Sequence, residues 1–154
     1  MANTFTQIYV HVVFSVKQRI SLIQNSWREE LHKYITGIIR NEGHKLLAIN
    51  SMPDHIHILI SLKPDASLSE LIRDVKANSS KWINEKKFVK TKFSWQEGFG
   101  AFSCSHSQLD KVIHYIQSQN EHHKERTFRE EYISFLKKYD VSYDPKYVFD
   151  IDEK

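Results

Sequence analysis

The stretch that decides the fold is PDHIHILISL, residues 53–62. Apolar side chains occupy every second position: Ile56, Ile58, Ile60 and Leu62. The alternate positions begin with His55 and His57. Residues two apart in a strand lie on the same face. The pattern therefore predicts a strand with one buried isoleucine face and a second face that carries two neighbouring histidines.

Three further segments have the pattern of strands. Residues 7–16 (QIYVHVVFSV) alternate in the same way, residues 45–50 (KLLAIN) form a short apolar run, and residues 99–105 form another. Residues 45–50 and 55–62 are separated by four residues that include Pro53, which supplies a turn dihedral. These two segments are predicted to form a hairpin.

Apolar residues recur at helical spacing over residues 26–42, 67–85 and 107–125. Each segment opens with a pair typical of a helix N-terminus: Ser26 with Glu29, Ser67 with Glu70, and Ser107 with Asp110. A shorter amphipathic segment follows, built on Phe128, Tyr132, Phe135 and Leu136.

The order strand, helix, strand, strand, helix, strand is that of an α+β, ferredoxin-like (βαββαβ) antiparallel sheet. Two helices are expected on one face, with an additional C-terminal helix that carries Tyr115. The other face, with the histidines, is expected to be open to a ligand. We expect one domain over residues 1–154, with a core at about 5–125 and a C-terminal helix and tail at about 126–154.

The composition limits the possible functions. The 22 Lys and Arg against 19 Asp and Glu give a net charge of only +3, so contact with nucleic acid must come from local basic patches. The single Cys104 excludes an internal disulfide and a cysteine-based zinc site. The first sixteen residues have neither a basic leader nor a long apolar run. We therefore expect a cytoplasmic protein without a membrane partner.

The histidine pair could bind one metal ion, because its two side chains stand on the same face. Nine histidines in 154 positions give about 0.5 His-x-His pairs by chance. Solvated or hydrogen-bonded histidines therefore remain an open alternative until a third ligand and a reactive group are found.

The helix at 107–125 offers such groups. Beside its apolar stripe lies a more polar one, in which Tyr115 and Gln119 are four residues apart and can meet at one site. A phenol and an amide oxygen there could act as nucleophile and metal ligand. A tyrosine that packs with its hydroxyl at the surface is the alternative.

Four segments resemble the HUH single-tyrosine transposases of the 200/605 type of insertion sequence. These segments are HVVFSVKQR (11–19), MPDHIHILISL (52–62), SLSELIRDVKANSSKWIN (67–84) and HYIQSQNEHHK (114–124), in the order of the family. The resemblance implies that His55 and His57 are the HUH metal ligands, Gln119 the third ligand and Tyr115 the nucleophile.

The family resemblance also implies an activity. A divalent ion, Mg²⁺ or Mn²⁺, polarises a phosphate of single-stranded DNA, and the tyrosine forms a 5′-phosphotyrosine intermediate from which strands are rejoined. The DNA carries a hairpin near the ends of the element. The protein is expected to be a homodimer, with Tyr115 acting either in its own subunit or in its partner.

Basic side chains that could hold the DNA backbone are Lys17, Arg19, Arg73, Lys76 and Lys81, with further lysines over 86–92. Trp95, Phe99 and Phe102 could stack on bases, although packing is favoured. Three other functions stay open: a repeat-associated or domesticated HUH nickase, a binding remnant without cleavage, and an RNA-recognition module. The histidines favour the enzyme, because such a module needs aromatic residues at those positions.

Overall fold

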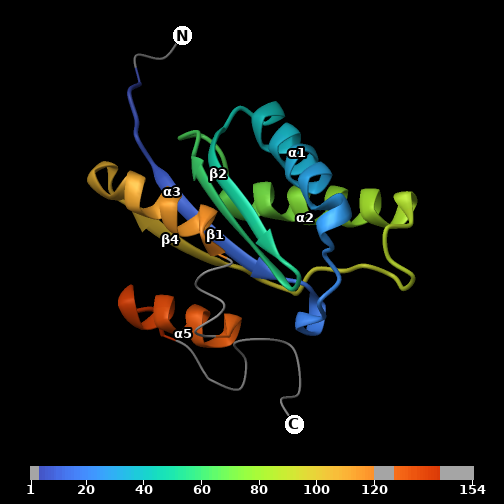
Figure 1. Cartoon of the computed structure of the whole chain (residues 1–154). Helices are drawn as coiled ribbons and strands as arrows, with labels where there is room; N and C mark the ends of the chain where they lie inside the picture. Colours follow the sequence, from blue (N-terminus) through green and yellow to red (C-terminus); the bar gives the residue numbers. More distant parts are fainter. Residues whose placement is uncertain (1–3, 120–126, 143–154) are drawn as a thin grey trace.

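The computed structural model describes residues 4–119 and 127–142 (Figure 1). Its centre is a four-stranded antiparallel sheet in the order β2-β3-β1-β4. The strands are β1 (Tyr9–Ser15), β2 (Lys45–Met52), β3 (His55–Ser61) and β4 (Gly100–Cys104). The predicted α+β, ferredoxin-like arrangement is confirmed, and so is the hairpin of the second and third strands.

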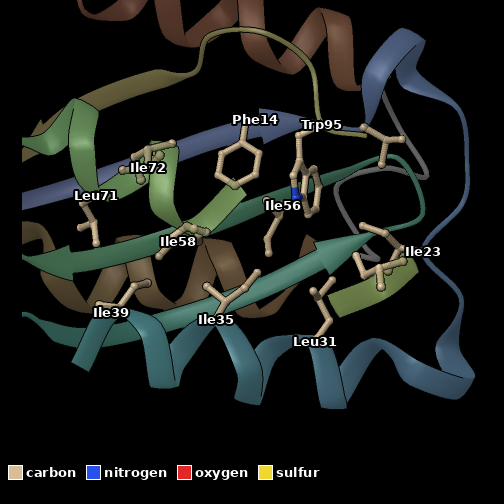
Figure 2. Packing of buried hydrophobic residues seen from close by; sticks show 14 of the residues in the cluster. Phe14, Ile23, Leu31, Ile35, Ile39, Ile56, Ile58, Leu71, Ile72 and Trp95 are labelled. Atoms are coloured by element: carbon tan, nitrogen blue, oxygen red, sulfur yellow. The ribbon is translucent and has the colours of Figure 1, made fainter. Parts of the chain in front are cut away.

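Two helices cover one face of the sheet, α1 (Asn25–Asn41) and α2 (Leu68–Lys86) (Figure 1). The strands present Phe14, Ile56 and Ile58 to this layer, all fully buried. The helices contribute Leu31, Ile35, Ile39, Leu71 and Ile72 to the same core (Figure 2). The isoleucine face of β3 is therefore the core face, as its alternation predicts.

The helix starts follow the predicted caps only in part. Ser67 caps α2, because its hydroxyl accepts the backbone N–H of Glu70 at 3.3 Å. The prediction for Ser26 is wrong, since α1 begins at Asn25 behind Gln24, which makes no side-chain cap. The prediction for Ser107 is also wrong, because this residue lies inside a short 3-10 turn, η2 (His106–Gln108), that precedes the helix.

The histidine face is not open, contrary to the expectation from the sequence. It is covered by α3 (Leu109–Gln117) and α5 (Phe128–Lys138), on the side of the sheet away from α1 and α2 (Figure 1). Under α3, Ile116 packs on Leu59 and Cys104. Under α5, the apolar contacts are made by Val13, Phe102, Phe128, Tyr132 and Leu136.

The predicted helix at 107–125 is interrupted within the described residues. The α3 helix ends at Gln117, with Ser118 in a non-helical conformation as its C-cap, and Gln119 is helical again. Residues 120–125 of the prediction lie outside the described part of the chain. Across residues 4–119 and 127–142 the structure contains no helix long and apolar enough to cross a membrane.

A buried histidine in α1 makes the fold sensitive to acid. His32 shares a hydrogen bond with Ser51 Oγ at 2.8 Å, and burial lowers its pKa to about 4. Its reference pKa is near 6.5, so between these values the unfolded chain binds a proton that the folded chain excludes.

We therefore expect the free energy of unfolding to fall as the pH drops from 7 toward 4, with His32 contributing about 2–3 kcal/mol of that loss. Urea denaturation followed by circular dichroism at pH 7, 5.5 and 4.5 measures it. His32→Gln should show a smaller acid loss than the wild type, whereas the exposed His106 replaced by glutamine should not. Equal pH slopes in all three proteins would contradict the assignment.

Candidate active site

Both histidines of the pair lie on the β3 strand and are fully buried, at 0% exposure. The register places Ser15 opposite His55 and Val13 opposite His57 on the neighbouring strand β1. The ring centroids of His55 and His57 are 5.2 Å apart. The strand geometry predicted from the sequence thus brings the two imidazoles together, beneath α5 rather than at an open surface.

The Nδ1 atom of each imidazole, called its outer nitrogen below, is held by another side chain. His55 Nδ1 lies 2.7 Å from Asp54 Oδ1, and His57 Nδ1 lies 2.8 Å from His11 Nε2. Such partners fix the orientation of a ligand imidazole and the nitrogen it offers. Both Nε2 atoms are thereby directed to one place, where they meet the carboxylate of Glu131.

His11 is a neutral partner in this arrangement. Its side chain is buried, and this burial, reinforced by the nearby His57, lowers the pKa of His11 to about 3. At neutral pH the His11 ring can accept the Nδ1 proton of His57. In that tautomer the Nε2 lone pair of His57 is available to a ligand.

Tyr115 of α3 reaches the same place from the same chain. Its ring centroid is 6.0 Å from that of His57 and 5.7 Å from that of Phe135. Its side chain is half-buried, and its hydroxyl donates a hydrogen bond to Glu131 Oε2. The predicted nucleophile therefore lies beside the predicted metal ligands.

Gln119 lies close to Tyr115, directly beyond the break that ends α3. It follows the break at Ser118, its side chain is fully buried, and its Nε2 donates to the backbone carbonyl of Tyr115 at 3.0 Å. The end of α3 is tied to β2, because Asn50 Nδ2 donates to the carbonyl of Ile116 at 2.9 Å. The role of Gln119 as third ligand stays a prediction.

Glu131 of α5 is the residue that the sequence analysis missed. Its carboxylate is fully buried, with Oε1 at 3.0 Å from His57 Nε2 and 3.7 Å from His55 Nε2. Ligand atoms of these three residues all lie within 4.8 Å of one another. A signal was present: Glu131 falls three residues after Phe128 and four before Phe135, inside the apolar stripe of the helix.

The basic residues fall into two groups. Lys17 is exposed and Arg19 half-buried in the turn η1 (Lys17–Arg19), which follows β1 at the end of the sheet where β3 begins. Gln18 and Arg19 have φ angles of 59° and 54°, an uncommon left-handed conformation outside glycine. The backbone N–H of Val16 donates to the carbonyl of Asp54 at 2.8 Å, so this turn adjoins the histidine pair.

The basic residues of α2 lie on the other side of the sheet from the histidines. Arg73 and Lys76 line a groove of about 490 Å³ between α2 and residues 94–99. Lys76 is engaged there, since its Nζ donates to the carbonyls of Gln96 (2.9 Å) and Gly98. Lys81 is exposed, and its Nζ lies 4.0 Å from Glu85 Oε1.

The remaining candidates for DNA contact differ in exposure. Lys87, Lys90 and Lys92 line a second cavity of about 970 Å³ beside α2. Trp95 and Phe102 are buried in packing clusters, and Phe99 is half-buried at the edge of the groove. Packing is therefore the observed role of Trp95 and Phe102, as the sequence favoured.

Comparison with known proteins gives a family match over most of the chain. The sequence model of the family described as "Transposase IS200 like" matches residues 4–119. This segment contains both histidines, Tyr115 and Gln119, and it ends before α5. A curated relative, the ISDra2 transposase TnpA of Deinococcus radiodurans, is 24% identical over 122 residues, which cover 75% of this chain and 86% of the relative.

Two solved structures share the fold. One is a putative transposase from Deinococcus radiodurans, with a TM-score of 0.63, 18% identity and coverage of 77% of this chain and 95% of the other. The second is a REP-associated tyrosine transposase bound to a REP hairpin, with a TM-score of 0.62 and 17% identity. The match covers 100% of this chain and 96% of the chain of that transposase.

Proposed function

The chain belongs to the family of IS200-like transposases, and we propose that it cleaves and rejoins single-stranded DNA with Tyr115 as its nucleophile. One observation carries the proposal. The hydroxyl of Tyr115 and the Nε2 atoms of His55 and His57 converge on the same buried carboxylate. A phenol and two imidazoles with fixed outer nitrogens form a preorganised site for phosphoryl transfer.

In the proposed reaction, the Tyr115 oxygen attacks the phosphorus of a DNA phosphodiester. The bond between phosphorus and the 3′-oxygen breaks as the bond to the tyrosine oxygen forms. The phenol loses its proton to a nearby base, and the leaving 3′-oxygen gains one. The products are a 5′-phosphotyrosine and a free 3′-hydroxyl, and attack by another 3′-hydroxyl rejoins strands without an external energy source.

The donor set fits a divalent metal ion. His55 and His57 present Nε2 atoms to one point, and Asp54 and His11 hold their outer nitrogens. We propose that His55, His57 and the amide oxygen of Gln119 hold Mg²⁺ or Mn²⁺. When bound, such an ion polarises the scissile phosphate and stabilises the charge of the transition state.

The substrate we propose is single-stranded DNA with a hairpin near the cleavage point. Lys17 and Arg19 are suited to hold its backbone, because their turn adjoins Asp54 at the histidine end of the sheet. Arg73, Lys76 and Lys81 lie across the sheet from the site, so they suit a more distant part of the DNA. A homodimer is part of the proposal, but Tyr115 and His57 of one chain are already neighbours, which supports action within one subunit.

A repeat-associated role is the second candidate. The structure of the REP-associated tyrosine transposase is similar to this chain over its whole length. The same chemistry is proposed for both roles, so the residues of the site do not separate an element-encoded transposase from a repeat-associated relative. An RNA-recognition module is disfavoured, because the sheet face that it uses for stacking is covered here by α3 and α5.

The proposal is tested with single-stranded oligonucleotides that carry hairpins from the flanks of the gene, labelled at either end. We expect Mn²⁺, but not EDTA, to give a protein–DNA adduct on a denaturing gel. The adduct should retain the label 3′ of the cut, and the released strand should end in a 3′-hydroxyl that a polymerase extends. Cleavage that leaves a free 5′-phosphate and no adduct would contradict the tyrosine mechanism.

A further inference from the structure

A charged side chain is buried inside the apolar face of α5. Glu131 is fully buried, next to Tyr132 and one helical turn from Phe128, and both of these residues pack onto the sheet. Burying a carboxylate is costly unless it is paired with charges, hydrogen-bond donors or a metal. The position of Glu131 therefore points to a specific partner.

That partner is the predicted active site. Oε1 faces the Nε2 atoms of both histidines, at 3.0 Å from His57 and 3.7 Å from His55. Oε2 accepts the hydroxyl of Tyr115. One carboxylate thus connects the proposed nucleophile to the proposed metal ligands, with a different oxygen for each.

We propose that Glu131 is a metal ligand, through Oε1, and a positioning residue for Tyr115, through Oε2. The inference rests on the proposed function and deepens it, by adding an acidic ligand from a helix that the family match over 4–119 does not include. Ligands at about 2.1 Å from an ion lie up to roughly 4.2 Å apart, close to the 4.8 Å span of these atoms. The carboxylate suits a hard ion such as Mn²⁺ or Mg²⁺.

The docking of α5 fixes where this carboxylate lies. The Phe128 ring stacks on the His55 ring, with centroids 4.0 Å apart and planes at 10°. Tyr132 packs on the backbone of Gly100, where an added Cβ would lie 2.6 Å from Tyr132 Cε2. The α5 helix is therefore anchored on β3 through Phe128 and on β4 through Tyr132, and Glu131 lies between these two residues in the sequence.

Direct titration of Mn²⁺ onto the full-length protein without DNA tests the inference, by calorimetry and by the Mn²⁺ electron paramagnetic resonance signal. We expect Glu131→Gln to bind Mn²⁺ at least about tenfold more weakly than the wild type. Glu130→Gln is the matched control: Glu130 is adjacent on α5, exposed and bonded to Thr127, and its replacement should leave the affinity unchanged. Mn²⁺ affinity that is unchanged or higher in Glu131→Gln would overturn the proposal and leave α5 as a cover over the site.

A second variant changes the helix position without changing a ligand. Gly100→Ala should push Tyr132 and α5 away from the sheet and weaken Mn²⁺ binding several-fold, with the far-ultraviolet circular dichroism retained. Wild-type affinity in Gly100→Ala would contradict the role given to the docking of α5. Because neither measurement uses DNA, both are independent of whether the proposed cleavage occurs.

Discussion

Tyr115→Phe is expected to abolish the covalent adduct, with strand cleavage at least roughly a thousandfold slower than in the wild type. The change removes one oxygen atom and keeps the ring, which packs near His57 and Phe135. Without that oxygen no phosphotyrosine bond can form. Single-turnover cleavage of the labelled oligonucleotide, run on a denaturing gel, gives the rate and the adduct yield together.

Tyr34→Phe is the matched control for this change. Tyr34 lies on α1 and stacks on Trp82, on the other side of the sheet from the histidines. Its loss of a hydroxyl should leave cleavage and adduct yield within twofold of the wild type. Adduct formation in Tyr115→Phe at a wild-type rate would remove Tyr115 from the mechanism.

His57→Ala is expected to lower metal-dependent cleavage by roughly a thousandfold, while binding of single-stranded DNA in EDTA changes little. The substitution deletes the Nε2 atom that faces Glu131 and the Nδ1 atom that bonds His11. The side chain is fully buried beneath α5, so its loss alters the proposed metal site rather than an exposed surface. Fluorescence anisotropy measures the binding and the gel assay measures the cleavage.

His106→Ala serves as the control, since His106 is exposed in the turn η2 before α3. Wild-type cleavage in His57→Ala would exclude the histidine pair from catalysis.

Mixing His57→Ala with Tyr115→Phe tests whether Tyr115 acts in its own subunit or in the partner subunit of the proposed homodimer. Because Tyr115 lies beside His57 of its own chain, we expect no recovery of activity in mixed dimers. Recovery would mean that the tyrosine works in the partner subunit.

Local sequence patterns were sufficient to predict the sheet. The alternation in β3 identifies the isoleucine face that packs on α1 and α2, and it places both histidines on the opposite face. The Ser67 cap was predicted correctly, since its hydroxyl accepts the backbone N–H of Glu70. The caps at Ser26 and Ser107 failed because the chain starts α1 one residue earlier and makes a 3-10 turn before α3. Such choices depend on tertiary contacts that a four-residue pattern does not contain.

The coverage of the histidine face could not be read from strand periodicity. It results from α3 and α5, which are joined to the sheet by contacts distant in sequence, such as the stacking of Phe128 on His55. The family resemblance carried Tyr115 and Gln119 but no residue of α5. The sequence shows Glu131 only as a charged residue at an apolar position. Its partners, His55 and His57, lie on β3, far away in the sequence.

Tyr132 shows why one tyrosine is singled out among several. It lies on α5 against Gly100, and burial raises the pKa of Tyr132 to about 12, which disfavours its phenolate. Tyr115 is half-buried, and its hydroxyl donates a hydrogen bond to the carboxylate of Glu131. The geometry therefore favours Tyr115 over Tyr132 as the proposed nucleophile.

The most direct test of the account is to locate the DNA on the trapped protein. After nuclease trimming and trypsin digestion, residues 112–124 form one peptide, VIHYIQSQNEHHK, whose single tyrosine is Tyr115. Mass spectrometry should find a nucleotide attached to this tyrosine, only in samples incubated with Mn²⁺. A nucleotide on a peptide that carries another tyrosine, Tyr132 or Tyr139 for example, would contradict the account.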